Sequence, residues 1–111
     1  MNPITQREYV AKILAAYRET PGTTGIIRRN DRLLAAQLHQ RGVPLLVVEN
    51  ALILAAARRL LRPAGSPPLS TIRSLHYFLG TVEEVLHRDM SQDYFRYLRN
   101  KIETLLHTPQ T

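Results

Sequence analysis

Residues 44–61 have the sequence PLLVVENALILAAARRLL, and this stretch decides the fold. Pro44 stands where a helix tolerates proline best, in its first turn. Apolar side chains then follow in every direction around the helix axis instead of along one stripe, a pattern typical of a helix enclosed by others. The alanines at 51, 55 and 56 are small enough for neighbouring helices to approach closely. The stretch therefore predicts a central apolar helix over roughly residues 44–62.

Two further helices are predicted before the central one. The first covers residues 2–20, with Asn2 as its N-cap and Pro3 in its first helical position. The second lies within residues 22–42 and ends at Gly42, the residue type that commonly follows a helix C-terminus. Ile26 and Ile27 belong either to this helix or to the loop before it.

Two more helices are predicted after the stiff proline-rich loop at residues 62–69. One covers residues 70–89 and is capped by Ser70 or Thr71, and Gly80 in its middle predicts a close crossing with another helix. The last covers residues 91–106, with Ser91 as its N-cap. The side chains predicted to face inward from it are Phe95, Leu98, Ile102, Leu105 and Leu106.

These segments together define the predicted fold class. The chain shows no internal repeat, no low-complexity tract and no long alternating segment that would indicate a sheet. Its 111 residues suffice for one enclosed core. We therefore expect an all-α protein with a single helical domain over residues 1–111. It is predicted to be a bundle of about five helices around the central one, with a frayed tail at about residues 107–111.

The composition argues against several classes of protein. The chain has no cysteine, which excludes a disulfide framework, a zinc–thiolate site and a thiol nucleophile. Pro44, Glu49 and Asn50 interrupt its longest apolar run, residues 43–57, which is too short and too polar to span a bilayer. The N-terminus MNPITQREYV lacks the basic-then-apolar order of a signal peptide. We expect a cytoplasmic protein with no membrane partner.

Three potential metal ligands lie on the helix predicted over residues 70–89. His76, Glu83 and His87 lie on one side of that helix, and Glu84 with His87 forms one Glu-x-x-His step. Di-iron bundles need two such steps and two more inward-pointing glutamates. An i,i+4 surface pair between Glu83 and His87, with Glu84 and Arg88 beside it, is the simpler interpretation. No metal site and no cofactor is predicted.

The carboxylates give no catalytic pattern either. Asp31 stands between Arg29 and Arg32 near a helix start, which indicates a cap or an ion-pair member. Glu49 has strongly apolar neighbours, so burial would require a partner such as an arginine of another helix. Such a pair would either fix the helix register or line a pocket. The sequence contains no phosphate-binding glycine loop, and we expect no enzyme activity.

The charge balance is the main functional clue. The chain has 15 lysines and arginines against 9 acids, a net charge of +6 and an isoelectric point of about 10.3. All the basic residues except Lys12 and Lys101 are arginines, whose planar fork suits phosphate recognition. A GC-rich genome would also favour arginine without regard to function. Such a high isoelectric point in a small domain is nevertheless typical of nucleic-acid binding.

The candidate nucleic-acid contacts fall into three groups along the chain. The first opens the helix within residues 22–42, where free backbone N–H groups also favour phosphate. The second flanks the proline loop, although arginine at a helix C-terminus is also explained by the helix dipole alone. The third lies on the last helix and includes a tyrosine, and tyrosines are stacking candidates. In order, the groups are Arg28, Arg29 and Arg32; Arg58, Arg59, Arg62, Arg73 and Tyr77; and Arg96, Tyr97, Arg99 and Lys101.

The segment RGVPLLVVENALILAAARRL, followed by PPLSTIRSLHYFLGTVEEVL, resembles the helical domain of primosomal DnaD-type proteins and of some plasmid replication initiators. The shared features are a Gly-hydrophobic-Pro turn, an alanine-rich helix, and a further helix with aromatic and apolar positions four apart. Here those positions are Phe78, Val82 and Leu86, with leucine where the family has tryptophan. The resemblance covers about half the chain. It implies a helical module that contacts DNA and partner proteins in the replication of a chromosome or mobile element.

The sequence therefore predicts a non-catalytic nucleic-acid-binding module, with DNA favoured over RNA. The alternative is a protein-interaction or oligomerisation module whose apolar helix faces close onto a partner or a second copy. An exposed apolar patch of more than a few hundred Å² would favour that alternative. A single basic surface formed by several helices would favour nucleic acid.

Overall fold

The computed structural model describes residues 4–107 and is all-α. It contains five α-helices and one short 3-10 helix, so the predicted fold class is confirmed. Within residues 4–107 the only strand-like pairing is a single parallel bridge between Thr23 and Ile72. The elements are α1 (Gln6–Glu19), α2 (Arg29–Gln40), α3 (Leu45–Leu60), η1 (Leu75–Phe78), α4 (Leu79–His87) and α5 (Gln92–His107).

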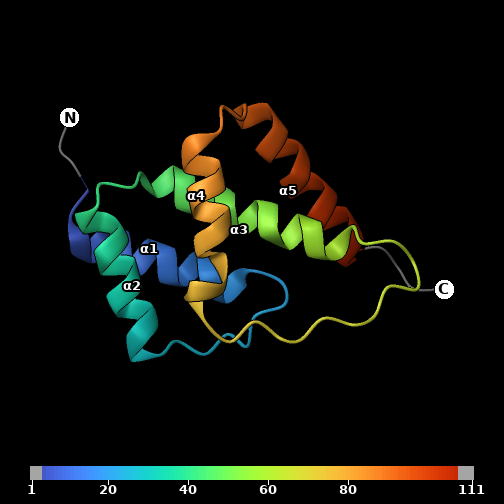
Figure 1. Cartoon of the computed structure of the whole chain (residues 1–111), viewed down its shortest axis with the longest axis horizontal. Helices are drawn as coiled ribbons and strands as arrows, with labels where there is room; N and C mark the ends of the chain where they lie inside the picture. Colours follow the sequence, from blue (N-terminus) through green and yellow to red (C-terminus); the bar gives the residue numbers. More distant parts are fainter. Residues whose placement is uncertain (1–3, 108–111) are drawn as a thin grey trace.

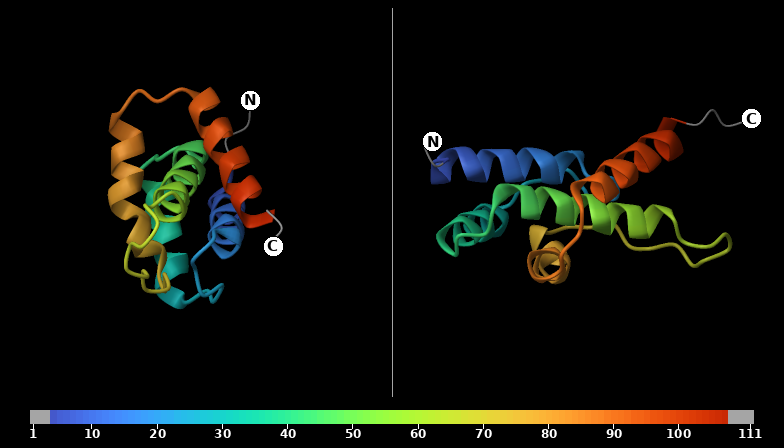
Figure 2. Two further views of the ribbon diagram at one scale, coloured as in Figure 1. Left: turned by 90° about the vertical axis from the view of Figure 1, so that its right-hand side faces the viewer. Right: turned by 90° about the horizontal axis from the view of Figure 1, so that it is seen from above.

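The predicted central helix is α3, which packs against α1, α4, α5 and η1 (Figure 1). Its buried side chains include Val48, Ala51, Leu52, Leu54 and Ala56, as expected for a helix enclosed on most sides. Helix α2 packs chiefly on α1 instead. Helices α4 and α5 lie on opposite sides of α3, and α1 lies on the same side as α5 (Figure 2).

Helix α1 begins later than the sequence predicted. The proposed cap Asn2 and the neighbouring Pro3 lie outside the described residues, and α1 starts at Gln6 with Thr5 as its N-cap. The Thr5 hydroxyl accepts the Glu8 backbone N–H at 3.1 Å, which satisfies one of the free donors at the helix start.

The helix predicted over residues 70–89 is the largest error. Residues 70–74 are not helical, η1 begins only at Leu75, and neither Ser70 nor Thr71 is a helix cap. The cause is a non-local pairing. The Ile72 N–H donates to the Gly22 carbonyl at 2.7 Å, and the Ile72 carbonyl accepts the Thr24 N–H at 3.0 Å. These bonds hold the segment straight, and the helix forms only after it.

Gly80 was also misinterpreted. No heavy atom outside its own helix and chain neighbours lies within 4 Å of the position that a Cβ would take there. Gly80 is exposed in the first turn of α4, so it marks no helix crossing.

Helix α5 is capped as predicted, but other parts of the chain cover less of its length than the sequence predicted. The Ser91 hydroxyl accepts the Tyr94 N–H at 3.2 Å. Phe95 and Ile102 are buried with Leu98, whereas Leu105 and Leu106 are 42% and 52% exposed and do not face inward. The reason is the course of α5, whose C-terminal end diverges from α3 (Figure 2).

Tyr9 joins α1 to the turn before α3 inside the core. Its hydroxyl donates to the Val43 carbonyl at 2.8 Å, and its ring packs edge-on to His39. Burial raises the pKa of Tyr9 from 10.0 to about 12. A raised acid pKa in the folded state means that folding favours the protonated form.

We therefore expect stability to fall as the pH rises from 10 to about 12, because ionised Tyr9 is tolerated better in the unfolded chain. Tyr9→Phe cannot ionise and should lose less stability over that interval, although it starts from a lower value. Urea unfolding of both proteins at a series of pH values measures the difference. Parallel losses in the two proteins would show that Tyr9 is not the source.

Candidate nucleic-acid interface

Two long loops lie side by side along one edge of the molecule (Figure 1). The loop after α1 meets the loop after α3 through the backbone bonds of Ile72 with Gly22 and Thr24. Neither loop contains an acid, because the sequence has no Asp or Glu at residues 20–30 or at residues 50–82. We call this surface, with the start of α2, the basic edge. Its basic residues are Arg28, Arg29, Arg32, Arg59, Arg62 and Arg73.

Asp31 connects the start of α2 to the second loop. One carboxylate oxygen accepts the Arg28 N–H at 2.9 Å, and the other accepts the Leu75 N–H at 2.8 Å. The Ser74 hydroxyl is 3.4 Å from the second oxygen. The side chain is 1% exposed, so this is a buried acid with backbone donors as its partners. The cap predicted for Asp31 is confirmed, and the contact places Arg73 beside the start of α2.

The same carboxylate changes the predicted role of the α2 N-terminus. The sequence predicted that free N–H groups there would favour phosphate. The Arg28 N–H instead donates to Asp31, and the N–H groups of Asp31 and Arg32 donate to the Arg28 carbonyl. A negative charge from the protein already lies at this helix start. The groups at α2 that carry positive charge for phosphate are the guanidinium groups of Arg28, Arg29 and Arg32, which are exposed.

Arg59 connects the end of α3 to the second loop and lies close to Gly22 of the first. Its guanidinium donates to the Ser70 carbonyl at 2.8 Å and to the Tyr77 hydroxyl at 3.1 Å, and it lies 5.5 Å from the Tyr77 ring centre. Gly22, with φ of +93°, passes so close that a Cβ there would lie 3.2 Å from Arg59 Nε. Arg59 is thus a positioning residue of the basic edge. Tyr77 is 51% exposed, which leaves part of its ring accessible for stacking.

Arg62 and Arg73 continue the basic edge along the second loop. Arg62 is half-buried and lines a cavity of about 200 Å³ together with Pro21, Gly22 and Arg59. Arg73 follows the bridging residue Ile72 directly and is exposed. The second loop therefore brings Arg62 and Arg73 to the edge where it meets the loop after α1.

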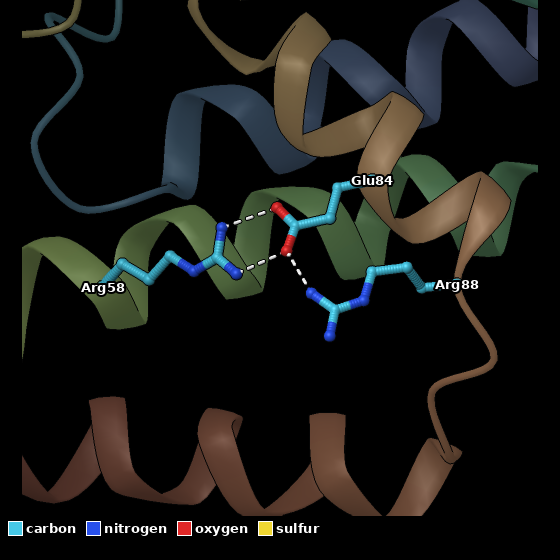
Figure 3. A network of polar contacts seen from close by, with 3 residues as sticks. All are labelled: Arg58, Glu84 and Arg88. Carbon is cyan, nitrogen blue, oxygen red and sulfur yellow. Dashed lines mark hydrogen bonds and ion pairs between the residues drawn. The ribbon is translucent and has the colours of Figure 1, made fainter.

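Arg58 does not belong to this surface, although it is the neighbour of Arg59 in the chain. Both of its terminal nitrogens bind Glu84, at 2.6 and 2.7 Å, and Arg88 binds the same carboxylate at 2.9 Å (Figure 3). The hydrogen bond between the two side chains raises the pKa of Arg58. The same bond is the largest of the effects that lower the pKa of Glu84 to about 2. Arg58 connects α3 to α4 and has a carboxylate as its partner, so we no longer assign it to phosphate.

The candidates on α5 are also separate from the basic edge. Helix α5 packs chiefly on α3, on the side away from α4 (Figure 2). Arg96 pairs with Asp93 at 3.1 Å, and Tyr97 and Lys101 are exposed on the same helix. Arg99 lines a groove that also contains three glutamates. The basic edge therefore does not include the α5 candidates, whose role in binding stays a prediction.

Sequence reasoning missed two arginines that extend the basic surface. Arg7 and Arg18 line two adjoining cavities between α1 and α2, of about 430 and 450 Å³, and Arg32 lines both. The residues that line them include no carboxylate. Arg7 and Arg18 are 11 positions apart, which is about three helical turns and places them on one face. That spacing was available in the sequence.

The remaining polar candidates have structural partners. Glu83 binds His87 at 3.3 Å, as predicted for an i,i+4 pair, and also binds Arg41 at 2.7 Å. Glu84 binds Arg88, also as predicted. Glu49 is half-buried at the edge of a groove, so the expected buried acid is Asp31 rather than Glu49. Residues 4–107 include no cluster of three or more potential metal ligands.

Comparison with known proteins identifies no relative of the chain. The chain matches no family model, no curated protein and no solved structure. The resemblance to the DnaD-type helical domain therefore stays a prediction. Among the helices that the structure describes, none has both the length and the apolar character that crossing a membrane requires.

Proposed function

We propose that the chain binds nucleic acid without catalysis, and that the basic edge is the contact surface. The observation that carries the proposal is the contact between the loop after α1 and the loop after α3, which lie within the acid-free stretches 20–30 and 50–82. Ile72 pairs the two loops, and Asp31 joins the second loop to the start of α2. Six arginines lie on this edge. A phosphate backbone would find several guanidinium groups there and little opposing charge.

The chemistry of the basic edge suits a phosphate backbone. Arginine offers a planar fork that matches two phosphate oxygens, and it loses less hydration than lysine when it binds. Tyr77, fixed by Arg59, adds an exposed ring on which an unpaired base can stack. We favour DNA over RNA, and the role in replication rests on the DnaD-type resemblance alone.

The test compares two variants with the same change in net charge. In the edge variant Arg29, Arg62 and Arg73 become glutamine; in the control variant Arg96, Arg99 and Lys101 become glutamine. We expect the edge variant to bind a short labelled DNA duplex about tenfold more weakly than the parent protein. The slope of log K against log salt should become less negative by about 2.7, which corresponds to three lost phosphate contacts. We expect the control to change both quantities far less. Fluorescence anisotropy over a range of salt concentrations measures both.

Two results would contradict the proposal. Equal losses in the two variants would show that net charge, not the basic edge, attracts the DNA. Binding by the parent protein that does not weaken as salt rises would exclude phosphate contacts altogether. The same titrations with single-stranded DNA and with RNA decide which nucleic acid is preferred.

The alternative function, a protein-interaction module, is favoured by a different surface. The end of α5 leaves Leu106 exposed at the border of an apolar groove, on the side of α3 away from α4.

A further inference from the structure

A groove lies between the end of α1, the middle of α3 and the last turns of α5. Its volume is about 420 Å³, and its floor is apolar, with Leu52 and Ile53 from α3 and Ile102 from α5. Leu106 borders the groove and is 52% exposed. The apolar side chains of α5 thus continue beyond the part of the helix that the rest of the chain buries. Leu106, at the exposed end, lines this groove.

The rim of the groove is acidic on a protein that is otherwise basic. Glu19, Glu49 and Glu103 line it, from three different helices, and Arg99 is the only base among the lining residues. Three of the chain's nine acids therefore meet at one groove, although the net charge of the chain is +6. This combination of charge and apolar floor differs from every part of the basic edge.

We propose that this groove is a docking site for a cationic amphipathic helix of a partner protein. Apolar side chains at i, i+3, i+4 and i+7 of such a helix would fill the floor beside Ile53, Ile102 and Leu106. Lysines or arginines flanking that stripe would face Glu19, Glu49 and Glu103, and charge complementarity of this kind sets specificity and orientation.

Other occupants fit the groove less well. The three glutamates repel phosphates, so nucleic acid is disfavoured there. A second copy of this chain offers Leu61 and Leu69, which lie in or beside the proline-containing loop, and Leu33, which is exposed beside Arg32 on α2. Leu33 is followed on its exposed face by Gln37 and not by a second large apolar side chain, so it forms no apolar stripe. A partner helix that combines leucine and lysine on adjoining faces matches the groove better than nucleic acid or a second copy does.

The experiment uses a labelled peptide with leucines at i, i+3, i+4 and i+7 and lysines on both flanks, titrated with the intact protein. A protein of charge +6 repels a cationic peptide overall, so nonspecific electrostatic attraction cannot produce binding. We expect binding that weakens about tenfold in the double variant Glu49→Gln, Glu103→Gln. The double variant Glu8→Gln, Asp89→Asn changes the net charge equally at exposed sites outside the groove and should bind like the parent.

A second pair of variants tests the apolar floor. Leu106→Asn should weaken peptide binding several-fold, while Leu105→Asn, an exposed neighbour that does not line the groove, should not. Both positions are exposed, so neither variant should impair folding. Failure of the parent protein to bind the peptide, or equal effects of the two asparagine variants, would overturn the proposal. So would a dimer of the parent, seen by sedimentation, that Leu106→Asn dissociates, because a second copy would then be the occupant.

Discussion

Replacing Phe78 with alanine is expected to lower the free energy of unfolding by about 4 kcal/mol, the largest effect of any single change considered. Phe78 ends η1 where α4 begins, and its side chain is 0% exposed. Its ring packs edge-on against Tyr17 of α1 at 6.1 Å between centres and against Tyr77 at 5.2 Å. Removing the ring leaves a cavity at the point where α1 and the η1–α4 segment meet.

Guanidinium unfolding followed by circular dichroism measures this loss. Phe78→Leu fills part of the same space and should lose clearly less stability, which keeps the prediction testable if the alanine variant does not fold. Tyr97→Ala removes an aromatic ring that is 57% exposed on α5 and should change stability by no more than about 0.5 kcal/mol. Similar losses in Phe78→Ala and Tyr97→Ala would show that Phe78 does not anchor the core.

Asp31→Ala is expected to destabilise the protein by about 3 kcal/mol, because the change removes the acceptor of two backbone donors. The N–H groups of Arg28 and Leu75 would lose their partner, and the Leu75 N–H lies in a buried residue. Asp31→Asn keeps one carbonyl oxygen and should lose less. Urea unfolding of both variants gives the comparison.

Asp93→Ala is the matched control for Asp31. Asp93 is also an acid near a helix start, but its side chain is 87% exposed and it pairs only with Arg96. Exposed pairs of this type contribute little, so the control should stay within about 0.5 kcal/mol of the parent protein. A loss in Asp31→Ala no greater than that in Asp93→Ala would mean that water replaces the carboxylate without cost.

The helices were predictable where a local pattern decides the structure. The stretch at residues 44–61 is apolar on every face, and only a central position buries such a helix. The helix prediction was wrong at residues 70–74 because Ile72 continues a helical apolar spacing in the sequence. Its backbone is instead bonded to Gly22 and Thr24, which lie in a distant part of the chain. The burial predicted for Leu105 and Leu106 was wrong for a different reason. The apolar stripe of α5 was predicted correctly, but it extends past the part of the helix that other residues cover.

The identity of the basic residues was predictable, but their grouping was not. Arg58 and Arg59 are adjacent in sequence, and because successive helical residues point about 100° apart, one meets Glu84 and the other meets Ser70 and Tyr77. No local pattern distinguishes the two. Asp31 shows the same limit, because its cap was predictable while its bond to Leu75 depends on tertiary structure.

The bond between Asp31 and Leu75 also bears on how the protein forms during synthesis. The two residues are 44 positions apart, so the ribosome has already released α1, α2 and α3 when Leu75 emerges. Until then the Asp31 carboxylate lacks one of its two backbone donors, and the loop after α1 lacks the strand-like segment that pairs with it. The first half of the nascent chain can therefore form helices but not the finished edge, which needs residues 72 and 75 from the second half.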